Sequence, residues 1–317
     1  MTVPLLATAR PPARRHGGLA RVVPLVTVVF ILVLLLGPGL LSGIGPVDTT
    51  DAFLSPPSAE HWFGTDQLGR DVFSRTVFGA RPVLAASLLG VVVAVVAGVA
   101  LGVAAGVAPR WLNAVLMRVV DVLLALPVLL IALILIATAG SGVRSIVIAL
   151  GVAFTPGFAR VVESSVRKLR TAEYVQAAQV FGSTTLRTSV RHLLPNLMTE
   201  VVVLASSAVG WAVLTASTLS FLGLGVSLPQ PDWGSDLAAG ATSLSTSWWL
   251  ATFPGAAITV TILLANFTGD QLMTLLDPRE GVRLRQSLPR FLGGRRARPS
   301  RAAVTEVRVP DAKREAA

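Results

Sequence analysis

The sequence contains a series of long apolar runs without a charged residue, and these runs constrain the fold more than any other feature. A bilayer core is about 30 Å thick, and about 20 helical residues cross it because each residue rises about 1.5 Å. Charge-free runs lie at residues 22–41, 82–108, 122–142, 145–159 and 201–230. A further run, residues 237–269, is too long for one helix, and we expect Pro254 to separate an outer loop from a span that reaches about Leu276. The sequence therefore predicts an all-α membrane protein with six transmembrane helices.

The composition supports this fold class and excludes several others. Of the 317 residues, 53% are hydrophobic and only 14% are charged, which is too apolar for a soluble domain of this length. The absence of cysteine excludes disulfides, thiolate metal sites, iron–sulfur clusters and cysteine nucleophiles. The formal net charge is +10, but the basic residues lie between the apolar runs, so this excess does not predict nucleic-acid binding.

The positions of the basic residues predict the orientation in the membrane, because positively charged loops are retained on the cytoplasmic side. With the N-terminus inside, 23 of the 27 Lys and Arg residues fall in cytoplasmic segments. Only Arg70, Arg75, Arg81 and Arg144 fall outside. Both termini are therefore predicted to be cytoplasmic, an N-in/C-in topology with no nucleic-acid partner.

The apolar runs also divide the chain into segments. Residues 1–21 are predicted to form a basic cytoplasmic tail, residues 22–41 the first transmembrane helix, and residues 42–81 an external loop with an interfacial helix. Residues 82–278 would form a five-helix core with a cytoplasmic loop at 163–195, and residues 279–317 a basic disordered cytoplasmic tail. A cleaved signal peptide is the alternative for the first run. That run is longer than the roughly 7 to 15 apolar residues of a signal peptide, and no small-x-small cleavage site follows Leu41.

The second apolar run carries a small residue at every fourth position along one helix face. The residues are Gly90, Ala94, Gly98, Gly102 and Gly106. Such a stripe lets the backbone of a second helix approach closely, as in GxxxG packing. Helix packing is therefore the predicted role, and a substrate path along the stripe is the alternative.

Two prolines lie inside predicted spans, where a proline frees backbone carbonyls of the preceding turn. Pro127 lies in the third run and Pro156 in the fourth. Both positions are therefore candidates for bends.

The sequence offers little of the chemistry that an enzyme would need. Neither lysine follows a glycine-rich turn, so no P-loop nucleotide site is present. The three histidines lie in different segments, which argues against a histidine metal site or a catalytic triad. Asp121, Glu200 and Asp270 fall near predicted cytoplasmic ends of spans, which argues against a proton relay within the membrane. We therefore predict a non-catalytic chain that binds no cofactor or metal.

The external loop ends in a polar segment that contains an aromatic interface anchor and a helix start. Trp62 and Phe63 precede Thr65 and Asp66, either of which can cap exposed backbone N–H groups. This pattern predicts a short interfacial helix that leads into the second span.

The loop between the fourth and fifth spans has a strong internal pattern. Tyr174, Ala177, Ala178 and Phe181 follow i, i+3, i+4, i+7 spacing, which places them on one face of a helix. Gly182 can end that helix in the left-handed conformation, Ser183 or Thr184 can cap the next helix, and Pro195 suits the first turn of the fifth span. The pattern predicts a helix–turn–helix elbow, exposed to the cytosol or, alternatively, packed against the membrane.

The spacing of Ala177-Ala178, Gly182, His192 and Leu194-Pro195 resembles the EAA loop of ABC importer permeases. Residues 63–75 and residues 219–225 with Pro231-Asp232-Trp233-Gly234 are similar to the dipeptide/oligopeptide and nickel branch, specifically its C-type permease subunit. Gly269-Asp270 and the end of the last span at Leu276-Asp277-Pro278-Arg279 also resemble that branch. The resemblance covers roughly residues 20 to 280.

The resemblance implies a type I ABC importer permease in a bacterial inner membrane, for peptides, nickel or related small solutes. It implies four kinds of partner: a second homologous permease subunit, two cytoplasmic ATP-binding subunits that use ATP and Mg²⁺, an extracytoplasmic solute-binding protein and the lipid membrane. The loop residues expected to contact an ATP-binding subunit are Glu173, Tyr174, Gln176, Ala177, Ala178, Phe181, Gly182, Leu194 and Pro195. The external loop motif consists of Gly64, Thr65, Asp66, Gly69, Arg70 and Asp71.

One position departs from the family pattern, because Gln176 stands where the motif has its glutamate. An ion pair at that position is therefore not expected. Two other classes of function stay open at this point: a secondary transporter driven by an ion gradient, and a membrane scaffold that transports nothing. Neither of these needs a docking elbow, so the elbow is the feature that separates them from an ABC permease.

Overall fold

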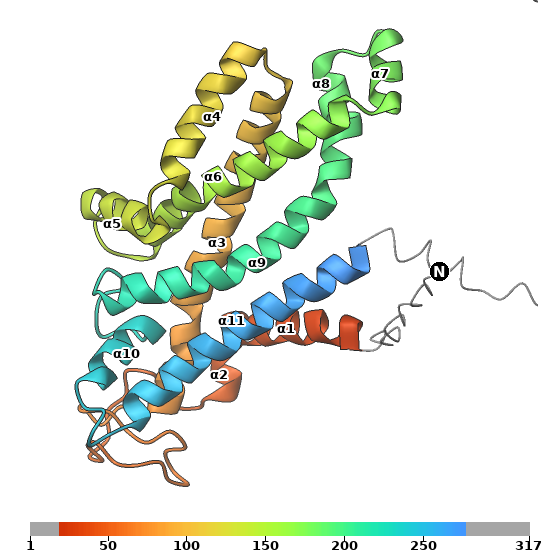
Figure 1. Cartoon of the computed structure of the whole chain (residues 1–317). Helices are drawn as coiled ribbons and strands as arrows, with labels where there is room; N and C mark the ends of the chain where they lie inside the picture. The colour runs from red at the N-terminus through yellow and green to blue at the C-terminus, as the bar shows by residue number, and fades with distance from the viewer. Residues whose placement is uncertain (1–18, 277–317) are drawn as a thin grey trace, which may run out of the picture. The chain divides into compact units, whose positions relative to one another are not determined.

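The computed structural model describes residues 19–276, and throughout this range the chain forms helices and loops without a β-strand. In chain order the elements are α1 (Leu19–Leu36), α2 (Pro38–Leu41), α3 (Val72–Val107), α4 (Arg110–Leu124), α5 (Val128–Ala139), α6 (Val143–Arg170), α7 (Glu173–Val180), α8 (Thr185–Thr188), the π-helical turn η1 (Ser189–Leu193), α9 (Leu194–Phe221), α10 (Trp233–Ala241) and α11 (Trp249–Leu276). Figure 1 shows their arrangement, with α7 and α8 at one end of α3 and the loop that precedes α3 at the other. The predictions for residues 1–18 and for the tail from residue 277 lie outside the described residues.

The packing of α3 against α6 forms the centre of the fold, and the small-residue stripe lies in this contact. A Cβ atom on Gly102 would lie 2.7 Å from the carbonyl oxygen of Ala159, and one on Gly106 would lie 2.5 Å from Val166 Cγ1. Gly98 faces Phe158 in the same way. Because α6 occupies the stripe, its glycines allow close helix contact and leave no room for a substrate path along it.

Four helices are long and apolar enough to cross a membrane: α3, α6, the continuous helix Ser189–Phe221 and α11. The pair α4 and α5 would add a fifth span, broken by a 91° bend. Pro127 is the N-cap of α5 and so lies at this bend, whereas α6 continues through Pro156. The apolar part of α1, Val22–Leu36, is shorter than the others. The count of six spans therefore remains a prediction.

The second span begins earlier than the apolar run indicated. Helix α3 starts at Val72 rather than near residue 82, and Asp71 caps it by accepting a hydrogen bond from Ser74 N at 2.7 Å. Neither Thr65 nor Asp66 caps this helix, and residues 42–71 contain no helix. The charged residues in the first turns of α3 form hydrogen bonds with groups of other segments. Arg81, for example, donates to the carbonyl oxygens of Leu35 and Leu36.

The last two spans also differ from their predicted limits. Helix α9 ends at Phe221, just before Gly223 with a φ of +81°, so residues 222–230 belong to a loop. Helix α11 begins at Trp249, and Pro254 lies inside it rather than at its start. The outer segment before it forms α10, which the apolar run did not reveal.

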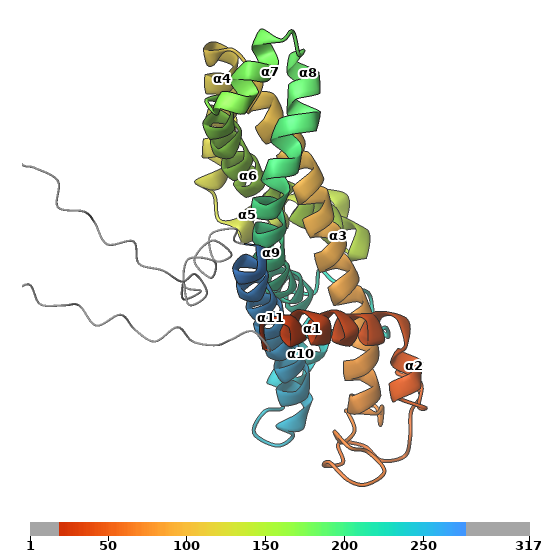
Figure 2. The ribbon, with the colours of Figure 1, turned by 90° about the vertical axis from the view of Figure 1, so that its right-hand side faces the viewer.

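Helix α1 crosses α11 and α3 instead of running along either of them, as Figure 2 shows. Thr268 donates a hydrogen bond of 2.8 Å to the Thr27 hydroxyl at the crossing with α11. Most of its large apolar side chains are exposed, among them Leu25 and Leu36. In a membrane these side chains are available to lipid or to a neighbouring subunit.

Candidate functional site

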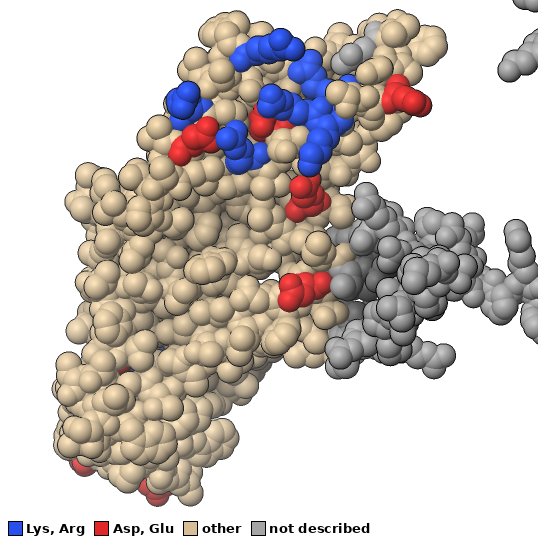
Figure 3. All heavy atoms as spheres, viewed as in Figure 1, with Lys and Arg blue, Asp and Glu red and all other residues tan. Residues whose placement is uncertain are grey.

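Exposed basic side chains gather at the end of the fold that carries α4, the end of α6 and the elbow, as Figure 3 shows. They are Arg110, Arg118, Arg160, Arg167, Lys168, Arg170, Arg187 and Arg191. At the other end, Arg75 is buried and Arg70 is largely covered. The two ends therefore differ in exposed positive charge, and each contains a set of residues singled out in the sequence.

The elbow, residues 173–195, is built as the local sequence signals predicted. Helix α7 ends at Val180 and is followed by Gly182, whose φ of +81° is left-handed, and Ser183 N donates to the Ala178 carbonyl at 3.0 Å. This is the 6→1 bond of a Schellman motif. The Thr184 hydroxyl then accepts from Arg187 N at 3.3 Å and caps α8. Pro195 lies in the first turn of α9 as predicted, but η1 runs directly into α9, so the helical segment begins before this proline.

One side of the elbow is anchored in the protein core. Val175 is fully buried and belongs to an apolar cluster with Leu193 and Leu197 of the following helix and Val162 and Val166 of α6. Because the cluster joins α6, α7 and α9, the elbow has a rigid base.

The opposite side of the elbow is exposed and apolar. Phe181 is 89% exposed and Val180 84%, while Tyr174 and Ala177 are also exposed and Ala178 is half-buried. The helical face predicted from the spacing thus points outward, and the sequence analysis missed Val175 as the anchor. Large exposed apolar side chains on a rigid base are typical of a protein-binding surface.

The remaining elbow residues lie close to this face. Asn196 Nδ2 donates to the Tyr174 hydroxyl at 3.2 Å, which ties α7 to α9. Gln176 Nε2 donates to the Thr171 carbonyl at 3.3 Å, so the amide bonds the end of α6. Glu173 is exposed and Leu194 is half-buried. The π-helical turn η1 separates α8 from α9.

A shallow polar groove of about 580 Å³ lies next to the elbow end of the fold, between α6 and α9. Glu163 is buried, accepts from Asn113 Nδ2 at 2.9 Å and pairs with Arg167 at 3.4 Å. Ser165 donates to Glu200 at 2.5 Å. Across residues 19–276, no three His, Asp or Glu side chains are grouped so as to hold a metal ion.

The external loop motif forms a compact turn at the opposite end of the fold. Gly64 and Gly69 have φ values of +75° and +71°, and a Cβ on either would collide with a backbone carbonyl of the same loop. Thr65 is buried; its hydroxyl accepts from Ser55 N at 2.9 Å, and its carbonyl accepts from Trp249 Nε1 at 3.1 Å. The motif thereby fastens the loop to the start of α11.

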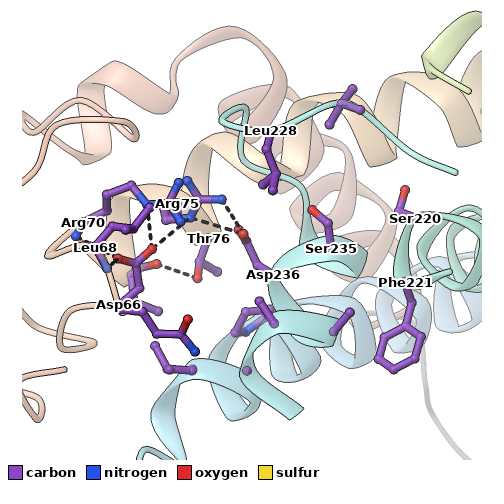
Figure 4. A pocket seen from close by; sticks show the side chains of 18 of the residues that line it. Asp66, Leu68, Arg70, Arg75, Thr76, Ser220, Phe221, Leu228, Ser235 and Asp236 are labelled. Carbon is purple, nitrogen blue, oxygen red and sulfur yellow. Dashed lines mark hydrogen bonds and ion pairs between the residues drawn. The ribbon is translucent and has the colours of Figure 1, made fainter. Parts of the chain in front are cut away.

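Three charged residues of this region meet a fourth, Asp236, from a distant part of the chain, as Figure 4 shows. Asp66 pairs with Arg70 at 2.7 Å and lies 3.9 Å from Arg75. The Arg75 guanidinium, which is only 4% exposed, pairs with Asp236 of α10 and donates to the carbonyls of Pro46 and Pro229. We refer to Asp66, Arg70, Arg75 and Asp236 as the outer charge cluster. Arg75 connects α3 to two loops and to α10.

Asp232 is the N-cap of α10, the helix that carries Asp236 of the outer charge cluster. Its carboxylate accepts from Gly234 N at 2.9 Å, Ser235 N at 3.2 Å and the Ser220 hydroxyl at 3.2 Å. The side chain is buried, and this burial raises the pKa of Asp232 to about 6, although the hydrogen bonds oppose the shift. Burial also raises the pKa of Asp236, against the lowering effect of Arg75.

The raised pKa of Asp232 predicts a pH-dependent stability. A carboxyl whose pKa is higher in the folded state stabilises the fold fully below pH 3.8, and this contribution is lost as the pH rises through about 6. Between pH 5 and pH 8 the difference is about 1 kcal/mol, or about 3 °C in melting temperature. We expect Asp232→Asn, which keeps an oxygen acceptor for the N-cap, to reduce the stabilisation from pH 8 to pH 5 by this amount. Melting curves in detergent at both pH values measure it, and an equal pH shift in both proteins would contradict the prediction.

The outer charge cluster is not predicted from the sequence. The local pattern identifies Arg75 as an external positive charge and contains no signal that it pairs with Asp236. The available signal was the occurrence of acidic and basic residues in two external segments that share one predicted side of the membrane. Their pairing depends on contacts over 161 positions of sequence, which no local pattern contains.

The chain matches the family model described as binding-protein-dependent transport system inner membrane component over residues 98–282. This range begins within the glycine stripe of α3 and includes the elbow, α9, α10 and α11.

Individual proteins are similar over a longer range. The chain is 37% identical over 276 residues to a Brucella suis protein named as a peptide transport system permease, with 87% of this chain and 92% of that protein covered. It is 37% identical over 265 residues to the dipeptide transport system permease protein DppC of Alkalihalophilus pseudofirmus (84% and 87% covered). It is 36% identical over 260 residues to the glutathione transport system permease protein GsiD of Shigella flexneri (80% and 86% covered).

Proposed function

Because the chain belongs to the binding-protein-dependent transport system inner membrane component family, we propose that it is the permease subunit through which an ABC importer moves peptides or related small solutes. It is a multi-pass bacterial inner membrane protein of the ABC importer permease class. The names of its relatives refer to peptides, dipeptides and glutathione, which supports a small peptide-like substrate.

The proposed orientation places the elbow in the cytoplasm and both termini inside. The cluster of exposed Arg and Lys side chains at the elbow end supports it, because basic segments are retained on the cytoplasmic side. In a six-span type I arrangement, α1 would be the first span and the bent pair α4–α5 a single broken span. The outer charge cluster would then lie on the extracytoplasmic side, where the solute-binding protein would dock.

The elbow is the single observation that carries the proposed function. Its exposed side, with Phe181 and Val180, would enter a groove on an ATP-binding subunit, while its buried side, with Val175, connects to α6 and α9. Closure of the two ATP-binding subunits would then move the elbow and, through its rigid base, the spans of this chain and of a homologous permease. Coupling requires only that the two conformations of the transporter, before and after this movement, differ in their affinity for nucleotide and for substrate.

In this mechanism the chain itself performs no chemistry. ATP and Mg²⁺ would be bound by the partner subunits, and this chain would transmit motion. The Gln176 side chain is a neutral amide that donates to the Thr171 carbonyl. It would therefore not supply the negative charge of the usual motif glutamate. Recognition at the elbow would depend chiefly on apolar contact.

We expect Phe181→Asp to reduce recovery of the ATP-binding subunits with the tagged chain by tenfold or more. A charge placed at a side chain that is 89% exposed leaves the fold intact but makes an apolar contact unfavourable. The measurement is affinity purification in mild detergent, followed by quantification of the co-purified subunits and their ATPase activity.

A matched control is Phe53→Asp, which makes the same change at an exposed phenylalanine in the external loop. This control should retain the ATP-binding subunits. Equal loss from both variants, or no loss from Phe181→Asp, would overturn the docking role of the elbow. Recovery of the wild-type chain alone would favour an ion-driven carrier or a scaffold.

A further inference from the structure

A cavity of about 530 Å³ lies beside the outer charge cluster, between the external loop, the start of α3, the loop after α9 and α10. Its size is within the range of small-molecule sites in proteins. One side is polar, with Asp66, Arg70, Arg75 and Asp236. The rest of the lining is uncharged and largely apolar, and Figure 4 shows Leu228 and Phe221 there together with Ser220 and Ser235. A ligand with one charged end and an apolar body matches this division.

Asp236 holds a carboxylate oxygen that the protein leaves without a partner. Its Oδ1 atom accepts from Arg75, whereas Oδ2 is buried and has no hydrogen-bond partner in the described part of the chain. Burial of a carboxylate oxygen without a hydrogen-bond partner is unfavourable, so a donor at this position would be stabilising. Rotation about the Cβ–Cγ bond of aspartate is soft, so a small rotation would present Oδ2 to a donor in the cavity.

The charged residues that line the cavity balance, because Asp66 and Asp236 contribute two carboxyl groups and Arg70 and Arg75 two guanidinium groups. The unmet requirement is therefore local to the Oδ2 atom of Asp236. Burial raises the pKa of Asp236 against the lowering effect of Arg75, because removal from water destabilises its negative charge. An ammonium group beside Asp236 would compensate it and would also supply the missing donor.

We propose that this cavity is a subsite for a small peptide, with Asp236 accepting a hydrogen bond from the N-terminal ammonium group and the apolar wall contacting the adjacent side chain. The proposal rests on the proposed function, because it assigns a substrate contact at the outer end of the permease. The cavity lies within one chain, so the subsite is complete without residues from a partner.

The test is calorimetric measurement of ligand binding to the purified full-length chain in lipid nanodiscs. The dipeptide Phe-Ala is compared with N-acetyl-Phe-Ala, which has no ammonium group, and with phenethylamine, which has no peptide bond. We expect Phe-Ala to bind, and acetylation to weaken binding by about tenfold or more, since a charge-assisted hydrogen bond is lost.

Two variants separate the subsite from a loss of folding. Asp236→Asn keeps an oxygen for Arg75 but removes the charge, and Ala239→Trp fills the cavity without a change of charge. Both should weaken Phe-Ala binding by about tenfold or more. Asp48→Asn, at an exposed aspartate of the same loop region, should have no effect.

No binding of Phe-Ala, equal binding of its acetylated form, or unchanged binding by both cavity variants would overturn the subsite. Equal binding of phenethylamine would overturn its assignment to peptides. Recovery of ATP-binding subunits with the chain and uptake of Phe-Ala by the assembled system test the proposed function separately. Uptake without binding at this cavity would reject the subsite alone, whereas absence of both partners and uptake would reject the function.

Discussion

Replacement of Arg75 by methionine is expected to destabilise the outer end of the protein by about 3–5 kcal/mol, because it leaves a buried charge without its partner. Arg75 is 4% exposed and bonds Asp236 as well as the carbonyls of Pro46 and Pro229. Methionine retains much of the apolar stem but none of the donors. The measurement is the melting temperature of the purified protein in detergent, together with the yield of folded protein.

Two further variants show whether the buried charge is the cause. Arg81→Met changes an exposed arginine six residues along α3, whose partners are the carbonyls of Leu35 and Leu36. It should cost less than about 1 kcal/mol. The double variant Arg75→Met/Asp236→Leu should recover much of the loss, because it removes both charges. If Arg75→Met and Arg81→Met melt at the same temperature, the structural role assigned to Arg75 is wrong.

Gly102→Leu is expected to abolish accumulation of folded protein. A Cβ at this position would lie 2.7 Å from both the Ala159 carbonyl oxygen and Val162 Cβ, and the rest of a leucine side chain has no space between α3 and α6. Overpacking of a rigid contact costs about 1–3 kcal/mol or more, and here the obstacle includes backbone, which cannot rotate away. Fluorescence-detected size-exclusion chromatography of a tagged chain measures the folded fraction.

Gly157→Leu is the matched control within the same helix pair. A Cβ on Gly157 of α6 would meet no atom within 4 Å, so a leucine there has room. This variant should give a monodisperse peak similar to that of the wild-type protein. A normal peak from Gly102→Leu would show that α3 and α6 do not pack as closely as described.

Several features of the elbow could be predicted from the sequence because their causes are local. The left-handed conformation at Gly182 and the cap of α8 by Thr184 each depend on residues within one or two turns. The outward helical face of α7 follows from periodicity in the same way. The spacing did not identify Val175 as the buried side of that helix, since this depends on α6 and α9.

The limits of the spans were predicted less well, because charge was used as the only boundary signal. Helix α3 extends ten residues further toward its N-terminus than the charge-free run, which starts at residue 82, since Arg75 and Arg81 find partners in other elements. The bend at Pro127 was foreseen from the proline, but its angle of 91° was not. A proline removes one backbone hydrogen bond, and the packing of the neighbouring helices then sets the angle.

The helical, membrane-spanning character of this chain and the turn of its elbow follow from the order of its residues, because transfer of apolar residues into lipid and the capping of helix ends are properties of short segments. Packing between distant segments determines which charged residues meet: Arg75 and Asp236 are 161 positions apart and form a buried pair only after α3 and α10 have packed. It also determines that the glycine stripe is filled by α6 and that a cavity lies beside the outer charge cluster. Such features arise from contacts between distant segments, whose free energy depends on burial and geometry that no single segment contains.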